Sequence, residues 1–266
     1  MIALKNGFPT ILPGVNIKTQ KNVPKYALRK GENIMIKIRW SILGNNLQRF
    51  IVFGLLLCCL CISGCAGSLY SVNMNYEAFG VNIPAYLKND NKNLNAAITV
   101  AEFTDVRKID DPTVIGHVVE RDGMKVLVVP KYAKPTQAVT TGIKRYLAKA
   151  GYKIYNDAGK WNAKEATPKT ESKLVVGGSI DKLELTCRKG FPTDSYNAVV
   201  KLTLVLTDPV KGNMLYRGSV ESNTSLEHVS FSETRMEEQL NIALGDAIEK
   251  IFEDKKLAQK IKEALM

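Results

Sequence analysis

The strictest constraint on the fold is an alternation of apolar and polar side chains over residues 196–207. The side chains on the apolar face are Tyr196, Ala198, Val200, Leu202, Leu204 and Leu206. A period of two predicts a β-strand with one face on a core, as is typical of antiparallel sheets. The turn residues 208–213 follow, and Met214, Tyr216 and Val220 then predict a returning partner strand. The chain must therefore build a sheet.

Helices surround this hairpin in the sequence. Apolar residues at spacings of three and four predict a helix over Pro135–Ala150, which Gly151 ends. The segment Ser230–Glu233 resembles a capping box before a long apolar stripe, and Asp254 is expected to cap a last helix. Further strands are expected over residues 98–106, 114–119, 125–129, 152–155 and 174–187. This order predicts an α+β fold: a single, mainly antiparallel or mixed sheet with helices packed mostly on one face.

A short apolar run precedes the domain. Ile51–Ile62 has twelve uncharged residues, whereas a membrane-spanning helix needs about 20. Lys37, Arg39 and Arg49 lie upstream, and a positive flank before a run of this length is typical of a secretory signal peptide. The alternative is a buried apolar helix whose cysteines are packing residues.

Ile62, Ser63, Gly64 and Cys65 follow this run, and they resemble a bacterial lipobox. The resemblance implies cleavage before Cys65 by signal peptidase II and lipidation of its sulfur, with a further acyl chain such as palmitate on the new amine. Two or more acyl chains anchor a protein stably to a membrane. Ala66 resembles the residue that allows export to the outer membrane, where the domain would face the periplasm.

These signals divide the chain into three parts. Residues 1–64 are predicted to be a signal peptide with an extended N-terminus, and Met35, 30 residues before the cleavage site, is the expected true start. Residues 65–95 are expected to be the lipidated N-terminus and a tether, which contains one strand around Val72, Met74 and Tyr76. Residues 96–266 are the predicted globular α+β domain.

The formal charge of +11 suggests nucleic acid or a membrane surface as a partner. However, residues 1–64 hold nine basic residues and one acidic residue, so the remaining chain carries only +3. The charge therefore predicts no nucleic-acid partner for the exported part.

Cysteine and glycine patterns predict no reactive centre. Cys187 is the only cysteine after Cys65, so no intramolecular disulfide is expected in the mature domain. It continues an apolar strand face and is interpreted as a small buried hydrophobe. Gly177-Gly178 lacks the Lys-Ser/Thr of a phosphate-binding loop and is interpreted as a bulge or a close backbone contact.

Candidate catalytic and metal-binding residues are few. His117 and His228 lie far apart and match no zinc-binding spacing. Asp105, Asp110 and Asp111 could bind a cation or act as acid and base, but a charge-rich loop tip is the favoured interpretation. Catalysis would require a pocket that gathers these carboxylates beside a histidine. We expect no cofactor, no metal and no enzymatic activity.

Several segments share a pattern with a known family: residues 97–107 (AITVAEFTDVR), 114–116, 141–152, 174–183 (LVVGGSIDKL), 196–206, the Asp208…Gly212 turn and the 238–244 stretch. These segments resemble the YajG-type lipoproteins, a family described as outer-membrane-associated and without an assigned activity. A looser likeness links the order of elements to auxiliary lipoproteins of ABC-type lipid transport systems. Neither likeness implies any site residue beyond the lipidated cysteine.

The expected function is that of a lipid-anchored lipoprotein of the bacterial cell envelope with a periplasmic binding or scaffolding domain. Its expected partners are the membrane, through Cys65, and an unidentified envelope protein. The alternative is an accessory lipoprotein subunit of an ABC-type lipid or solute transport system.

Overall fold

The computed structural model describes residues 69–78, 80–89, 97–155, 158–161 and 165–266. The lipobox, Cys65 and the rest of the expected signal peptide lie outside these ranges. The elements are β1 (Tyr70–Val72), β2 (Ala97–Val100), β3 (Thr104–Asp105), β4 (Gly116–Val119), β5 (Lys125–Pro130), α2 (Pro135–Lys149), β6 (Lys153–Tyr155), β7 (Leu174–Arg188), β8 (Asp194–Thr207), β9 (Met214–His228), α3 (Glu233–Phe252) and α4 (Lys255–Leu265).

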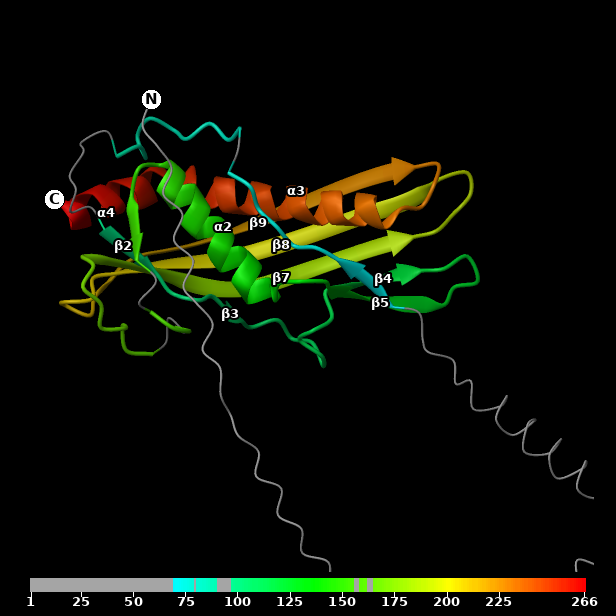
Figure 1. Ribbon diagram of the computed structural model, residues 1–266, viewed down its shortest axis with the longest axis horizontal. Helices are drawn as coiled ribbons and strands as arrows, with labels where there is room; N and C mark the ends of the chain where they lie inside the picture. The colour runs from blue at the N-terminus through cyan, green and yellow to red at the C-terminus, as the bar shows by residue number, and fades with distance from the viewer. Residues whose placement is uncertain (1–68, 79, 90–96, 156–157, 162–164) are drawn as a thin grey trace, which may run out of the picture. The chain divides into compact units, whose positions relative to one another are not determined.

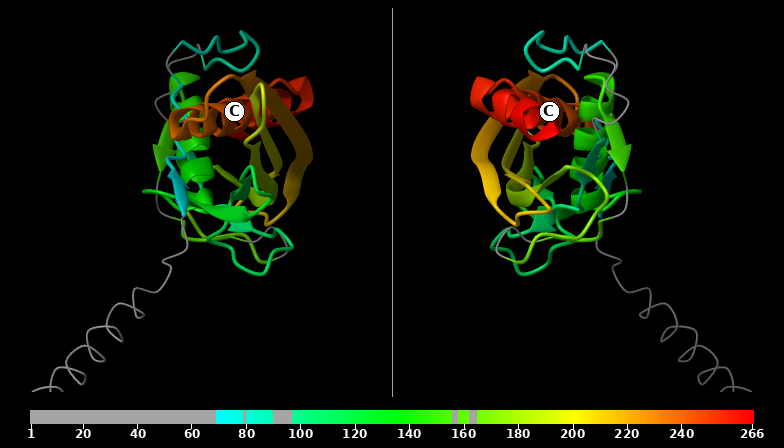
Figure 2. Two further views of the ribbon diagram at one scale, coloured as in Figure 1. Left: turned by 90° about the vertical axis from the view of Figure 1, so that its right-hand side faces the viewer. Right: turned by 90° about the vertical axis from the view of Figure 1, so that its left-hand side faces the viewer.

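Strand β7 lies within a nine-stranded sheet and pairs with four of its strands. Along one edge it pairs antiparallel with β8, which pairs antiparallel with β9. Along its other edge it pairs in succession with β2, β3 and β4, all parallel. Strand β5 is antiparallel to β4, β1 is parallel to β5, and β6 is parallel to β2. The sheet is mixed and its helices pack mainly on one face (Figures 1 and 2), which confirms the α+β prediction.

The alternation of β8 buries its apolar face completely. All six apolar side chains from Tyr196 to Leu206 have no exposed surface. They pack in one core with the apolar stripe of α3, which includes Met236, Leu240 and Leu244. On the opposite face, a smaller cluster of Ala101, Trp161, Val175 and Val205 covers one end of the sheet.

The two glycines of β7 allow close contacts with aromatic rings. A Cβ on Gly177 would come within 2.4 Å of Trp161, and a Cβ on Gly178 would come within 2.6 Å of Phe103. The irregularity in pairing falls between Ile180 and Lys182. The predicted close contact is therefore confirmed, but the bulge lies beyond the glycines.

The long C-terminal helix α3 begins differently from the predicted capping box. Its N-cap is Ser232, whose side chain makes no capping hydrogen bond. The backbone N–H of Ser232 donates instead to the Tyr196 hydroxyl at 2.9 Å, while Ser230 pairs with His228. The capping-box prediction was wrong because tertiary contacts satisfy these groups. The Asp254 cap of α4 is confirmed by its 2.8 Å bond from the Lys256 N–H.

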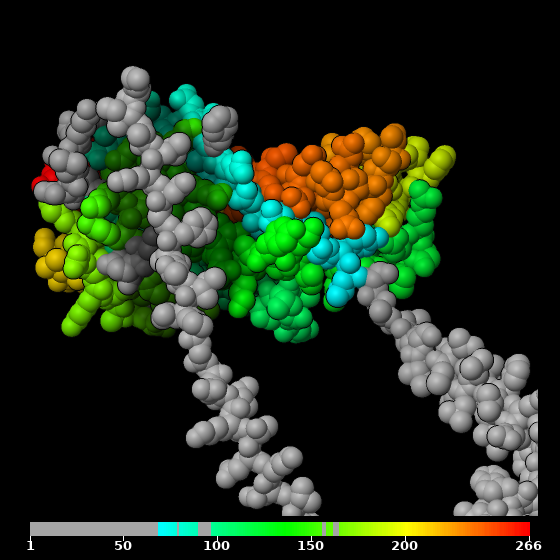
Figure 3. All heavy atoms as spheres, viewed as in Figure 1, coloured from blue at the N-terminus to red at the C-terminus, as the bar shows by residue number. Residues whose placement is uncertain are grey.

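Residues 70–78 and 80–89 are folded against the domain, and they lie within the range 65–95 that was expected to be the lipidated N-terminus and a tether. Five of their side chains belong to the main core: Val72, Met74, Tyr76, Ile83 and Leu87. After β1 the chain follows α3, where Glu237 and Asn241 accept hydrogen bonds from the N–H groups of Asn73 and Asn75. Figure 3 shows residues 69–78 as a cyan band between atoms of α2 and α3. We call residues 70–78 the strap.

Tyr76 fastens the strap between two helices. A Cβ on Gly142 of α2 would meet its Cβ at 3.1 Å, and a Cβ on Gly245 of α3 would meet its ring at 3.3 Å. Glycine lowers the stability of a helix interior by roughly 1 kcal/mol relative to alanine. Two helices therefore give up local stability at a slot that holds the Tyr76 ring, and Gly142 makes room for the Ile248 side chain as well.

We predict that Tyr76→Ala lowers the free energy of unfolding by about 3–4 kcal/mol, because it empties this slot. Urea denaturation of the mature protein measures the change. Tyr132→Ala is the control, since that ring is 76% exposed and its loss should cost no more than about 0.5 kcal/mol. Equal effects of the two substitutions would show that the strap does not contribute to the core.

Candidate functional site

The acidic residues singled out in the sequence do not form one site. Asp105 accepts hydrogen bonds from the Arg107 guanidinium at 2.7–3.1 Å, and the Arg107 side chain is 3% exposed. Arg107 also donates to the carbonyl oxygens of Pro112, Val114 and Leu183. Asp105 therefore neutralises an arginine that holds its loop in place.

Asp110, Asp111 and His117 line a hollow of about 640 Å³. Hydrogen bonds from Thr113 lower the pKa of Asp111, but no hydrogen bond or ion pair among the described residues joins His117 to either carboxylate. Asp181 and Glu184 line the same hollow, and within the described part of the chain none of its four carboxylates shares a hydrogen bond with His117 that would act as a proton relay. In the described ranges, no group of three His, Cys, Asp or Glu side chains could hold a metal ion.

Cys187 and His228 serve the fold. Cys187 is fully buried, and burial raises the pKa of its thiol to about 12, so the thiolate needed for nucleophilic attack is not formed at neutral pH. The interpretation of Cys187 as a small buried hydrophobe is confirmed. His228 bonds the backbone of Ser230 at the end of β9.

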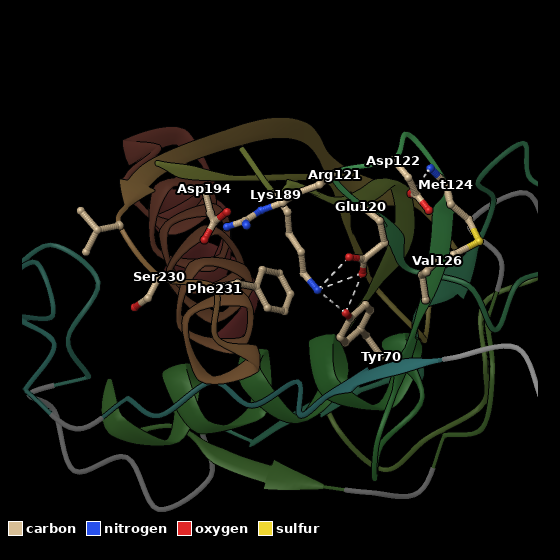
Figure 4. Close-up of a pocket in the computed structure, with 11 residues that line it drawn as sticks. Tyr70, Glu120, Arg121, Asp122, Met124, Val126, Lys189, Asp194, Ser230 and Phe231 are labelled. Carbon is tan, nitrogen blue, oxygen red and sulfur yellow. Dashed lines mark hydrogen bonds and ion pairs between the residues drawn. The ribbon is translucent and has the colours of Figure 1, made fainter. Parts of the chain in front are cut away.

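A second pocket, of about 820 Å³, lies where the sheet ends beside the start of the strap. Four segments supply its main side chains: Tyr70 begins β1, Glu120 follows β4, Lys189 follows β7, and Phe231 lies between β9 and α3. Its polar lining also includes exposed Arg121, Asp122 and Ser230 and buried Asp194 (Figure 4). We call it the strap-end pocket.

Three polar groups in this pocket satisfy one another. The Lys189 ammonium donates to the Tyr70 hydroxyl at 2.7 Å and to the Glu120 carboxylate at 2.9 Å, and the Tyr70 hydroxyl donates to Glu120 at 2.7 Å. The Lys189 and Glu120 side chains are only 20% and 22% exposed. Charge-assisted bonds of this length are the strong class of hydrogen bond.

Aromatic rings enclose the same ammonium group. Lys189 Nζ lies 4.2 Å from the centroid of Phe231 and 5.2 Å from that of Tyr70. The two rings are 5.3 Å apart, and Phe231 also stacks on Tyr196 at 6.0 Å. A cation over an aromatic face is attracted by the negative charge of the ring.

The proton states of the trio are fixed at neutral pH. Burial favours the neutral form of both charged groups, but their hydrogen bonds outweigh it, so the pKa of Glu120 is lowered and that of Lys189 is raised. Burial, the largest effect on Tyr70, raises the pKa of its hydroxyl. A lysine cation, a carboxylate anion and a neutral phenol therefore persist, which suits binding or structural support better than proton transfer.

Sequence reasoning missed all four central residues of this pocket. Each is a single residue at the end of a strand or in a turn, separated from the others by up to 161 positions. Glu120 adjoins the predicted Arg121–Gly123 turn, and Lys189 follows the long strand. The register of the sheet brings Tyr70, Glu120 and Lys189 together, and Phe231 joins them from the connection between β9 and α3.

Comparisons with known proteins give similarity at a low level. No protein-family model matches the chain, and no curated protein matches it. A Xanthomonas campestris protein of the DUF330 family is 13% identical with a TM-score of 0.45, covering 74% of this chain and 98% of that one. A neuraminyllactose-binding hemagglutinin homolog of Helicobacter pylori is 12% identical with a TM-score of 0.43. That match covers 73% of this chain and 98% of the homolog.

A minor lipoprotein of Acinetobacter baumannii is 14% identical with a TM-score of 0.33, covering 62% of this chain and 93% of that one. The similar structures thus include a bacterial lipoprotein. Similarity this low identifies no family, and it carries no ligand or activity over to this chain. Over the described part of the chain, every helix is too short or too polar to span a bilayer.

We predict that Lys189 and Glu120 stabilise each other by about 1–2 kcal/mol, because their bond is charge-assisted and partly buried. A double-mutant cycle of Lys189→Met and Glu120→Gln, followed by urea denaturation, measures this coupling. The exposed pair Lys201 and Glu221, 3.5 Å apart, is the control and should couple by less than about 0.5 kcal/mol. A coupling no larger than that of the control would show that the trio contributes little to the pocket.

Proposed function

We propose that this chain is a lipid-anchored lipoprotein of the bacterial cell envelope, whose domain binds or scaffolds a partner at the membrane surface. The observation that carries the proposal is the order of signals before β1: a basic flank, a twelve-residue apolar run and the lipobox residues Ile62–Cys65. Ala66 favours the outer membrane, with the domain facing the periplasm.

If Cys65 carries the anchor, only a short chain separates that anchor from the folded strap. Tyr70 begins β1 and lies five residues after Cys65, a distance of at most about 18 Å in a fully extended chain. The 30-residue tether expected from the sequence would have allowed roughly 100 Å. A lipidated Cys65 would therefore hold the strap-end pocket near the bilayer.

A binding role fits the chemistry of this pocket better than catalysis. Lys189 and Glu120 neutralise each other, whereas exposed Arg121 and Asp122 offer one charge of each sign beside aromatic surface. Mixed charge around apolar surface is typical of sites that recognise a protein or an amphipathic ligand. The proposed partner is an envelope protein that the domain meets at the membrane surface.

We predict that Cys65→Ala abolishes labelling of the protein by radioactive palmitate in growing cells, because it removes the lipidated sulfur. The variant should remain soluble or keep its uncleaved leader, as fractionation and gel mobility would show. Cys61→Ala is the matched control, since Cys61 lies in the same leader and should not affect labelling. Unchanged labelling of Cys65→Ala would contradict the lipobox.

We further predict that a photo-crosslinking amino acid at Arg121 yields a discrete protein adduct in intact cells of the native host, because this side chain is exposed at the pocket rim. The same group at Lys211, an exposed residue in the β8–β9 turn, is the control. Mass spectrometry identifies the adduct. Identical adducts at both positions, or none at Arg121, would contradict a partner at this pocket.

A further inference from the structure

Large apolar side chains are exposed on the turns at one end of the domain. Phe191 in the β7–β8 turn is 94% exposed, Val229 after β9 is 74% exposed, and Met124 in the β4–β5 turn is 58% exposed. Leu69, immediately before β1, is 62% exposed. We call these four residues the apolar tip. Exposed apolar surface gathered from separate segments marks an interaction site.

The register of the sheet brings the three turns to one level. Val119, the last residue of β4, pairs with Arg188, the last of β7. Asp194, the first residue of β8, pairs with His228, the last of β9. Each turn therefore starts within about one residue, or roughly 3.3 Å, of the others along the strands. The turns end the sheet together, as the right-hand side of Figure 1 shows.

The same strand register limits how far Cys65 can lie beyond the end of the sheet. Tyr70 pairs with Val128, which pairs with Gly116, which in turn pairs with Leu185. Leu185 lies three residues, or about 10 Å, before the end of β7. The five residues from Tyr70 back to Cys65 span at most about 18 Å. Even a fully extended anchor could therefore extend only about 8 Å past the level where the turns begin.

We propose that the apolar tip contacts the bilayer and inserts its side chains into the interface between headgroups and acyl chains. This proposal rests on the lipid anchor at Cys65, which leaves too little chain to hold the tip clear of the membrane. Aromatic and aliphatic side chains on a short projection are typical of interfacial insertion. The nearby charges are of both signs: Arg121 accompanies Asp122, Lys189 pairs with Glu120, and Lys125 and Arg188 are matched in number by Asp194 and Glu227. Insertion therefore does not depend on anionic lipid.

Tryptophan fluorescence tests this contact in the full, processed and acylated protein. Phe191→Trp and Val229→Trp each place a reporter in the tip. Val210→Trp is the matched control, because Val210 is 88% exposed in the β8–β9 turn at the other end of these strands. The native background is Trp161, which is 3% exposed, since Trp40 precedes the cleavage site. The proteins are reconstituted into phosphatidylcholine vesicles with plain or brominated acyl chains, with and without phosphatidylglycerol.

We expect both tip reporters to shift to shorter wavelengths on plain vesicles and to lose emission on brominated ones, equally with and without phosphatidylglycerol. The Val210→Trp reporter should show neither change. If the protein floats with the vesicles and its tip reporters stay water-like and unquenched, the bilayer contact is refuted although the anchor stands, and a protein is then the occupant of the tip. If the protein does not float and carries no fatty acid, the anchor itself is refuted, and the contact with it.

Discussion

The pairing of β7 along both edges determines where the other parts of the molecule lie. This strand has 15 residues, and β8 follows almost all of it on one side while β2, β3 and β4 follow one another on the other. Because β4 pairs with the last four residues of β7, the segments after both strands emerge together. Glu120 and Lys189 are the first residues of these segments, so backbone pairing alone brings their side chains within bonding distance.

The burial pattern along β7 differs between its two ends, because different parts of the protein pack on its faces there. Its first residues, Leu174–Gly178, are all buried, because the main core covers one face and the Trp161 cluster covers the other. From Leu183 to Cys187 burial alternates between buried and half-buried residues, as expected when only one face packs on a core. Helix α3 packs in the same core, and Phe231 and the pocket lie just before its N-terminal end. The polar end of the strand therefore coincides with the end that carries the candidate site.

Local pattern was sufficient to predict the three long strands, the helices and the fold class. It failed where a residue's role depends on distant parts of the chain. The alternation of Val72, Met74 and Tyr76 was visible, but the surface that buries it includes Gly142 and Gly245, which lie far along the sequence. The Ser230 capping box failed for the same reason, because the Tyr196 hydroxyl replaces the cap. The strap-end pocket has no motif, since it is assembled from single residues of four segments.

The ion pair between Lys189 and Glu120 is physically compatible with the proposed bilayer contact. A single charge near a bilayer loses hydration, which destabilises it, whereas a hydrogen-bonded pair is neutral overall and attracts more strongly as the local dielectric falls. Lys189 also lies against the ring of Phe231, and the carboxylate accepts a second bond from Tyr70. Lys189 and Glu120 are thus satisfied within the protein, whatever the apolar tip contacts. Because Tyr70 begins the strap, the same trio also ties the chain that leads to Cys65 to the turns that would rest on the membrane.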